Sequence, residues 1–234
     1  MEKNVSVIIS TYKNQDYLIE CVNSIYKQNF DGNIEILIGI DGCSETLDLV
    51  ENNLNFFSGT SVFYFEKNSG PYTLKNNLIN LSKYEMIVFF DSDDIMLPNF
   101  IKTFFKNIKE DNIFRFRYKN FDNESKIFEN NEEFAWGVFG LSKSTFKKVG
   151  YFQNWRCSGD YEFIKRANFL SVVVNSNFDL TFHRRVHGKS LTKKTDTNFS
   201  SEIRKKYQET VVSRIHSKIW EKPEFIKMEH KKIN

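Results

Sequence analysis

Short apolar runs alternate with amphipathic segments through the first 90 residues, and this alternation restricts the fold more than any other feature. The apolar runs are VSVIIS, IEILIGI, SVFYFE and EMIVFF, at residues 5–10, 34–40, 61–66 and 85–90. Helical spacing of apolar residues marks the three segments between them, residues 14–28, 46–57 and 69–82. Strands that alternate with helices at this distance form βαβ units. The pattern therefore predicts an α/β fold with a mainly parallel sheet flanked by helices.

The second half of the chain continues with both kinds of element. Residues 113–121 alternate like a strand, and residues 171–177, with three consecutive valines, are expected to form another strand. Helices are expected after Pro98, near Ser142 and after Gly159. In sheets of this class, ligands bind beyond the carboxyl ends of the strands, so the loops after the first four runs are the place to look for a site.

The fourth apolar run leads directly into Asp91, Ser92, Asp93 and Asp94. Because successive side chains of an extended chain point to opposite faces, Asp91 and Asp93 are expected on the same side. Carboxylates that lie so close repel each other, and a divalent cation relieves the repulsion. Ions such as Mg²⁺ or Mn²⁺ take one or two carboxylates and complete their shell with substrate phosphates. A metal-bound diphosphate is therefore one interpretation, and a turn that caps the next helix is the other.

The composition indicates a folded chain in a reducing compartment. Hydrophobic residues make up 40% and aromatic residues 16% of the 234 residues, which excludes a disordered chain. The three cysteines, Cys21, Cys43 and Cys157, have neither the spacing of a zinc site nor the even number of a disulfide framework. No apolar run approaches the roughly 18 residues of a membrane span, and the N-terminus lacks a signal-peptide core. We therefore predict a cytoplasmic protein.

Charge is distributed unevenly along the chain. From residue 182 onward, 14 Lys and Arg stand against 6 Asp and Glu, so this part carries +8 and the preceding part −5 of the net +3. Apolar residues four apart predict a basic amphipathic helix from Ser200 onward. We expect a domain over residues 1–198 and a helical C-terminal extension over residues 199–234. The extension would make a peripheral membrane contact, pack on its own domain, or bind a second subunit in a homodimer.

Three stretches carry a family resemblance: VSVIISTYKNQDYLIECVNSIYKQNF, IGIDGCSET and NSGPYTLKNNLINLSKYEMIVFFDSDDIMLPNFI. The chain closely resembles the inverting glycosyltransferases of family 2 over roughly residues 4–192. The resemblance implies the GT-A fold, a Rossmann-like fold of nucleotide-diphospho-sugar transferases with a mixed, mainly parallel sheet. It also implies transfer of a sugar from a nucleotide-diphosphate donor, with UDP as the expected nucleotide. The acceptor would be a hydroxyl of a saccharide or a glycolipid, in polysaccharide or glycoconjugate synthesis.

The resemblance assigns several residues to the nucleotide. Thr11 and Tyr12 match the first loop, which holds the base, and Asp41 matches the acid that accepts a hydrogen bond from uracil. Lys75 falls where the family often has a cation near the phosphates. In the simpler interpretations, Tyr12 packs on the first helix, Asp41 is a turn residue and Lys75 is a solvated lysine. The full set of expected nucleotide-binding residues is Thr11, Tyr12, Asp41, Lys75, Asp91, Ser92 and Arg185.

The resemblance also implies a Mn²⁺ or Mg²⁺ cofactor at the DSD motif. Asp93 is the first expected metal ligand, and Asp91 is the second. HRRVHGKSLT, at residues 183–192, resembles the closing motif of the family, which brings a His to the metal or the diphosphate. His187 is the matching residue, with Arg185 as a phosphate partner whose planar fork suits the leaving group.

Inverting transfer needs a carboxylate that takes the proton of the acceptor hydroxyl. The family often carries Glu-Asp at the start of a helix near this point, and here the pair is Gly159 and Asp160. Asp160 is the expected base and Glu162 the alternative, while an N-cap role for Asp160 is the simpler interpretation. Trp136 and Gly137 are expected beside the acceptor, because an aromatic face suits the apolar side of a sugar ring.

Two other functions stay open at this point. A nucleic-acid-binding module would explain the basic and aromatic residues 115–119 and the basic tail. It does not explain the acidic motif or the net charge of −5 over residues 1–181. We therefore expect no nucleic acid among the partners. A catalytically inactive, nucleotide-sugar-binding partner subunit is the second alternative, because Gly159 stands where the family often has Glu.

Overall fold

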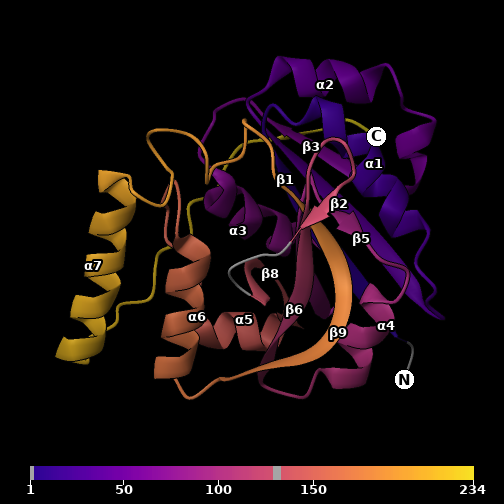
Figure 1. The fold of residues 1–234 in the computed structure, drawn as a ribbon. Helices are drawn as coiled ribbons and strands as arrows, with labels where there is room; N and C mark the ends of the chain where they lie inside the picture. The colour runs from indigo at the N-terminus through magenta and orange to yellow at the C-terminus, as the bar shows by residue number, and fades with distance from the viewer. Residues whose placement is uncertain (1–2, 129–132) are drawn as a thin grey trace.

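A mixed sheet with helices on both faces forms the centre of the computed structural model, which describes residues 3–128 and 133–234 (Figure 1). One half of the sheet consists of parallel strands in the spatial order β3 (Ser61–Phe65), β2 (Asn33–Asp41), β1 (Asn4–Thr11) and β4 (Met86–Asp91). The other half continues from β4 through β8 (Phe134–Ser142), β6 (Asn112–Phe121), β9 (Val173–Arg185) and β5 (Ile95–Met96). The short strand β7 (Ile127–Phe128) pairs with β6. The α/β fold class is confirmed.

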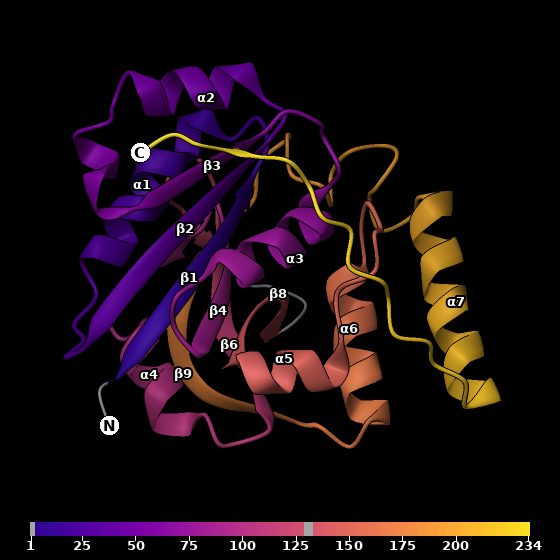
Figure 2. The ribbon, with the colours of Figure 1, turned by 180° about the vertical axis from the view of Figure 1, so that it is seen from behind.

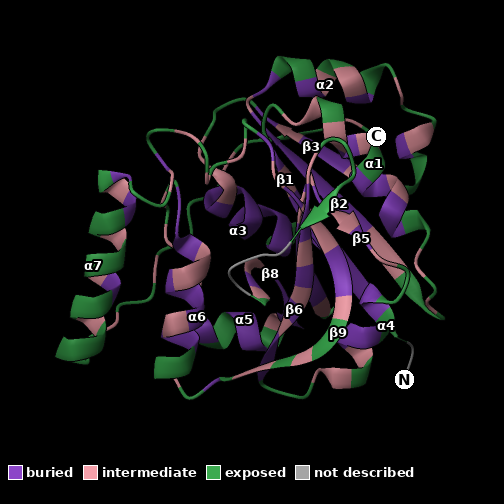
Figure 3. Cartoon of the chain, viewed as in Figure 1, coloured by how far each residue is buried: buried purple, intermediate pink, exposed green. Residues whose placement is uncertain are grey.

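Separate sets of helices cover the two faces of the sheet. One face packs against α1 (Gln15–Tyr26), α2 (Ser44–Glu51) and α4 (Phe100–Asn107). The opposite face, seen in Figure 2, packs against α3 (Pro71–Leu81), α5 (Lys143–Val149) and α6 (Gly159–Phe169). Strand β1 sends Val7 and Ile9 to the first core and Ile8 to the second, so it is buried on both faces (Figure 3). Burial on both faces explains the unbroken apolar runs in the sequence.

The strands β1, β2 and β4 end at the same edge of the sheet. Their last residues are Thr11, Asp41 and Asp91, and β1 is parallel to both of its neighbours. The loop after β2 turns at Gly42, which has a φ of +62°. A Cβ at Gly42 would lie 2.8 Å from the backbone nitrogen of Asn68, so only glycine fits this turn without a shift. The turn holds Asp41 against the loop that follows β3.

The second predicted helix, over residues 46–57, is too long. α2 ends at Glu51, and a short 3-10 helix over Phe56–Gly59 follows after a turn. The side chain of Asn53 donates a hydrogen bond to the Leu49 carbonyl at 2.8 Å. Asparagine side chains that bond to the backbone in this way compete with the helical hydrogen bonds, which explains the early end.

The C-terminal extension packs on its own domain. α7 (Glu202–Ser217) lies beside α6, and its Tyr207 stacks on Trp155 with ring centroids 4.3 Å apart. The helix ends at Lys218, which has a left-handed φ of +55°. It therefore covers only part of the extension predicted as helical over residues 199–234. Within residues 3–128 and 133–234, no helix combines the length and the apolar character needed to cross a membrane.

The last residues return to the sheet instead of continuing the helix. Pro223 lacks the amide for a helical hydrogen bond and disfavours helical geometry at the residue before it. β10 (Lys231–Lys232) pairs antiparallel with β3, and the Ile233 amide donates to the Val62 carbonyl at 2.9 Å. Figure 2 shows this tail passing α3 on its way to the edge of the sheet. The tail thus covers an edge strand that would otherwise expose unpaired backbone groups.

Candidate active site

The three carboxylates of the acidic loop after β4 differ in exposure and in their partners. The Asp91 side chain is 44% exposed, and the Asp93 side chain is 16% exposed. Asp93 Oδ2 lies 2.8 Å from His187 Nε2. Asp94 is buried, and its Oδ1 accepts a hydrogen bond from the Arg185 backbone amide at 2.9 Å. Asp91 and Asp93 therefore remain accessible to a ligand, whereas Asp94 stabilises the loop.

Asp94 and Ser92 are the buried members of this loop. Burial raises the pKa of Asp94 well above its usual value, and the charges of Asp93 and Asp91 raise it further. Ser92 Oγ accepts a hydrogen bond from the Asn14 side-chain amide at 2.8 Å. Ser92 therefore ties the acidic loop to the loop after β1, and this protein contact competes with its predicted contact to the nucleotide.

Lys75 reaches the acidic loop from α3. The residue is 3% exposed, and its Nζ lies 3.3 Å from Asp91 Oδ1 and 5.8 Å from the centre of the Phe89 ring. A buried ammonium needs a charged partner, and Asp91 supplies it. The interpretation of Lys75 as a solvated lysine is therefore wrong. The Lys75 ammonium instead lies beside Asp91, in the loop that is predicted to bind the diphosphate.

The residues predicted to hold the base lie at the ends of β1 and β2. The two carboxylate oxygens of Asp41 accept hydrogen bonds from the backbone amides of Ser69 and Gly70, at 2.8 and 2.9 Å. Burial raises the pKa of Asp41, against the opposing effect of these amides. Thr11 is buried, and its Oγ1 has no hydrogen-bond partner in the described part of the chain. Tyr12 is 37% exposed at the rim. A buried hydroxyl without a partner fits a ligand that brings its own polar groups.

Asp160 lies in the first turn of α6. Ser158 takes the N-cap position but makes no side-chain capping hydrogen bond, whereas Asp160 accepts one from an amide of the first turn, so a capping role and a role as base are compatible. The Tyr72 hydroxyl donates a hydrogen bond to Asp160 Oδ1 at 3.0 Å, and the Tyr161 backbone amide donates to the same oxygen at 2.8 Å. Asp160 is thereby held in one orientation by residues of two helices.

Gly137 lies between Asp160 and the acidic loop. A Cβ at Gly137 would be 3.1 Å from Asp160 Oδ2 and 3.4 Å from Asp91 Oδ2. The two carboxylates therefore face the same small space, which the missing side chain leaves open. Trp136 lies next to it and packs edge-on against Tyr161, with ring centroids 5.0 Å apart. The residues expected beside the acceptor are thus close to the expected base.

Two residues of α1 hold the motif at the end of β9. The Arg185 guanidinium donates to the Asp93 carbonyl at 3.0 Å and pairs with the Glu20 carboxylate. The Tyr17 ring lies 4.7 Å from that guanidinium and 4.6 Å from the His187 ring. These contacts favour a role for Arg185 in shaping the acidic loop over the predicted phosphate contact. His187 Nδ1 is buried without a partner among the described residues, which leaves one ring nitrogen for a ligand.

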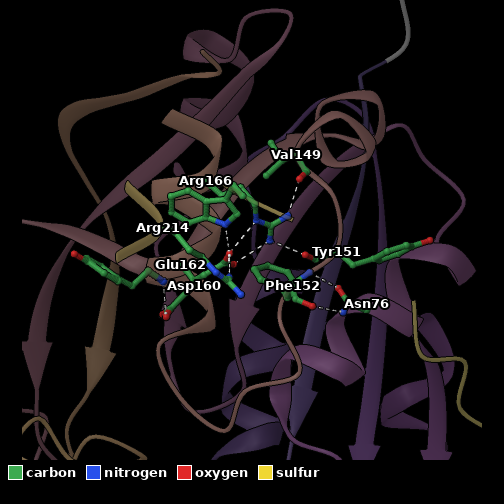
Figure 4. A network of polar contacts seen from close by, with 10 residues as sticks. Asn76, Val149, Tyr151, Phe152, Asp160, Glu162, Arg166 and Arg214 are labelled. Carbon is green, nitrogen blue, oxygen red and sulfur yellow. Dashed lines mark hydrogen bonds and ion pairs between the residues drawn. The ribbon is translucent and has the colours of Figure 1, made fainter. Parts of the chain in front are cut away.

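Glu162, the alternative base, is fully buried in a network of its own (Figure 4). Its carboxylate makes two contacts of 3.0 Å with Arg166, while Arg214 and Trp220 donate to its Oε1 at 3.4 and 2.7 Å. Residues two apart on a helix do not share a face, which separates Glu162 from Asp160. The structure therefore favours Asp160 as the base, and Glu162 joins α6 to the C-terminal segment.

Sequence reasoning missed Tyr17, Glu20 and Tyr72. Tyr17 and Glu20 lie one turn apart on α1, a spacing visible in the sequence, but nothing there indicates Arg185 as their common partner. Tyr72 contacts Asp160 across 88 positions of the chain. No local pattern reaches over such a separation.

Comparisons with known proteins show the family to which this chain belongs. Residues 6–187 match the family model described as glycosyl transferase family 2. The glycosyltransferase GlyG of Streptococcus pneumoniae serotype 4 is 26% identical over 235 residues, which is 87% of this chain and 78% of GlyG. The poly(ribitol-phosphate) beta-N-acetylglucosaminyltransferase TarS of Staphylococcus aureus strain Mu50 is 35% identical over 103 residues, or 42% of this chain and 17% of TarS.

A solved structure shares the fold of this chain. The crystal structure of S. aureus TarS 1–349 in complex with UDP-GlcNAc has a TM-score of 0.64 and 21% sequence identity to this chain. The match covers 81% of this chain and 60% of that chain, and it confirms the GT-A fold expected from the sequence. Because the family model covers most of its length, this chain belongs to glycosyl transferase family 2.

Proposed function

We propose that this chain transfers a sugar from a UDP-linked donor to an acceptor hydroxyl, with inversion at the anomeric carbon, in the synthesis of a polysaccharide or glycoconjugate. The observation that carries the proposal is that Asp160 and Asp91 face one small space above Gly137. Asp91 belongs to the loop proposed to bind the diphosphate. A sugar on that diphosphate and an acceptor beside Asp160 would meet in this space.

Support for a UDP-linked donor comes from the ends of β1 and β2. Two backbone amides fix the Asp41 carboxylate, which suits a base that has an N–H to donate. Thr11 Oγ1 offers a buried hydroxyl without a partner in the described chain. Lys75 lies where it would meet the phosphates. The solved structures of TarS include complexes with UDP-GlcNAc and with UDP.

A divalent metal, Mn²⁺ or Mg²⁺, fits the side chains of Asp91, Asp93 and His187. Carboxylate oxygens and an imidazole are suitable ligands, and Nε2 of His187 faces Asp93 Oδ2 at 2.8 Å. In residues 3–128 and 133–234, no three His, Cys, Asp or Glu side chains form a complete metal site. None is needed, because Mg²⁺ and similar ions take one or two carboxylates and fill their shell from substrate phosphates. When bound, the ion neutralises charge on the departing diphosphate.

Asp160 is the base in this proposal. Its Oδ2 takes the proton of the acceptor hydroxyl while the acceptor oxygen forms a bond to the anomeric carbon. The bond from that carbon to the diphosphate oxygen breaks, and its electron pair leaves with the diphosphate. Attack on the face opposite the leaving group inverts the configuration. Lys75, held against Asp91, keeps a positive charge near the leaving group.

Calorimetric titration with UDP and with GDP, each with and without Mn²⁺, tests the donor half of this function. We expect UDP to bind in preference to GDP, and more tightly with Mn²⁺. A panel of UDP-sugars that includes UDP-GlcNAc is then screened for release of UDP. Metal-dependent binding without release from any sugar would favour a binding subunit that lacks catalysis. Folded protein that binds neither nucleotide with Mn²⁺ present would overturn the proposal.

A further inference from the structure

We propose that Tyr72 is a positioning residue, which holds Oδ1 of Asp160 and thereby directs Oδ2 to the acceptor, and that Gly159 is needed to admit the Tyr72 ring. The inference rests on the proposed function, because it takes Asp160 as the base.

The hydrogen bonds of Asp160 distinguish its two oxygens. Oδ1 accepts from the Tyr72 hydroxyl at 3.0 Å and from the Tyr161 amide at 2.8 Å. Among the described residues no hydrogen bond reaches Oδ2, which faces the space above Gly137. Two donors on Oδ1 oppose rotation of the carboxylate. Oδ2 is therefore the oxygen left to accept a proton.

The Tyr72 ring is itself held in place. Tyr72 is 6% exposed, and its ring packs against Phe152 with centroids 5.6 Å apart. Burial first, and then the charge of Asp160, raise the pKa of Tyr72 well above its usual value. The hydroxyl consequently keeps its proton and remains a donor to Asp160.

Gly159 supplies the room for this ring. A Cβ at Gly159 would lie 2.7 Å from one ring carbon of Tyr72 and 2.8 Å from the next. The ring would have to move, and its hydroxyl would leave Asp160. The Glu that the family often has before this Asp would collide with the Tyr72 ring, so Gly159 and Tyr72 fit together. The absence of that Glu therefore does not imply an inactive protein.

Tyr72→Phe tests the inference, because it removes the hydroxyl and keeps the ring. The assay is UDP release from the UDP-sugar that the wild-type chain turns over, together with calorimetric UDP binding in Mn²⁺. We expect kcat to fall roughly 10- to 100-fold, the range known for residues that orient metal ligands through a hydrogen bond, while KM and UDP affinity stay within about twofold. Tyr151→Phe is the matched control, since its hydroxyl contacts Asn80 away from the site, and it should keep the wild-type kcat.

Gly159→Ala provides a second, independent test. It should lower kcat in the wild-type background and have little further effect in a Tyr72→Ala background, where the ring is absent. Thermal unfolding of each variant checks that it is folded.

The outcomes separate the inference from the proposed function. An active wild type with an unchanged kcat in Tyr72→Phe would overturn the inference alone. Equal losses of kcat and UDP affinity would do the same, because they would indicate a general structural role. A wild type that neither binds UDP nor releases it from any sugar would overturn both.

Discussion

Asp93 and His187 share a contact of 2.8 Å, and both are proposed to bind the metal. Asp93→Asn keeps the shape of the side chain and removes the charge that attracts a cation. We expect the Mn²⁺-dependent part of UDP binding to be lost, while binding without metal is retained. Calorimetry with and without Mn²⁺ measures both. If Mn²⁺ still strengthens UDP binding in this variant, Asp91 carries the metal role without Asp93.

Asp160→Asn should lower turnover and leave UDP binding unchanged. The amide cannot take the acceptor proton, so kcat should fall by roughly 10² to 10⁴, the usual contribution of a general base. UDP affinity should not change, because Asp160 is proposed to contact the acceptor and not the nucleotide. Steady-state kinetics and calorimetry give the two quantities. Asp196→Asn, at an exposed ion pair with Arg156, is the control. Full activity in Asp160→Asn would exclude it as the base.

Asp94 gives the acidic loop a pH-dependent stability. Burial, and then the charges of Asp93 and Asp91, raise its pKa in the folded protein. The folded state therefore keeps this proton to higher pH than the unfolded chain does. Its stabilising contribution is complete below the usual aspartate pKa of about 3.9 and is lost as the pH rises through the raised value.

Asp94→Asn cannot ionise and still offers a carbonyl to the Arg185 amide. Its free energy of unfolding should therefore increase relative to that of the wild type as the pH rises above the usual aspartate pKa of about 3.9. Urea unfolding at a series of pH values from about 4 upward measures the difference. A difference that does not change with pH would mean that the Asp94 carboxyl has the same pKa in the folded and the unfolded state.

At the scale of single elements, α6 combines the proposed base with a buried ion pair one turn long. Glu162 and Arg166 are both fully buried. Glu162→Gln leaves the guanidinium without its counter-charge, and breaking a buried pair from one side costs about 3–5 kcal/mol. We expect the free energy of unfolding in urea to fall by this amount. Glu209→Gln, on the exposed side of α7, should change it by less than about 0.5 kcal/mol. An equally small change in Glu162→Gln would contradict the prediction.

The same helix marks a limit of sequence reasoning. Two carboxylates two positions apart cannot occupy one site, and this much follows from helical geometry. Which of them faces the site depends on where Arg166, Arg214 and Trp220 lie, and the last two come from a distant part of the chain. The family resemblance favours Asp160 over Glu162, but the local sequence gives no physical reason for that choice.

The sequence predicts the bounds of a strand well where the strand's own apolar residues determine where it begins and ends. β1, β2 and β4 begin and end within one residue of the predicted runs, because both of their faces are buried and polar residues follow them. β9 was expected over residues 171–177, yet it runs to Arg185. Its later residues are ordered by pairing with β6 and β5, which are remote in the sequence.

At the scale of the whole molecule, the C-terminal tail, residues 221–234, joins helix α3 to the edge strand β3. Deletion of residues 221–234 removes β10 and the two 2.9 Å hydrogen bonds between Asn77 and the tail. An uncovered edge strand pairs readily with other chains. We therefore expect a lower Tm and concentration-dependent aggregation, measured by thermal unfolding and light scattering.

Ile233→Pro is the milder form of this experiment, since it removes the amide that bonds to Val62. It should lower Tm by less than the deletion does. A deletion variant that stays monomeric with an unchanged Tm would show that the edge of β3 needs no cover.

The C-terminal segment from Trp220 onward joins separate parts of the domain. It contacts Asn77 of α3 and pairs with β3, and Trp220 donates a hydrogen bond to Glu162 of α6. A chimera that joined the proposed donor half of one relative to the proposed acceptor half of another would break one of these contacts. The product is better redesigned by exchanging only the short segment around Trp136 and Gly137, which is proposed to face the acceptor. Asn77 and Glu162 then keep their contacts with the C-terminal segment.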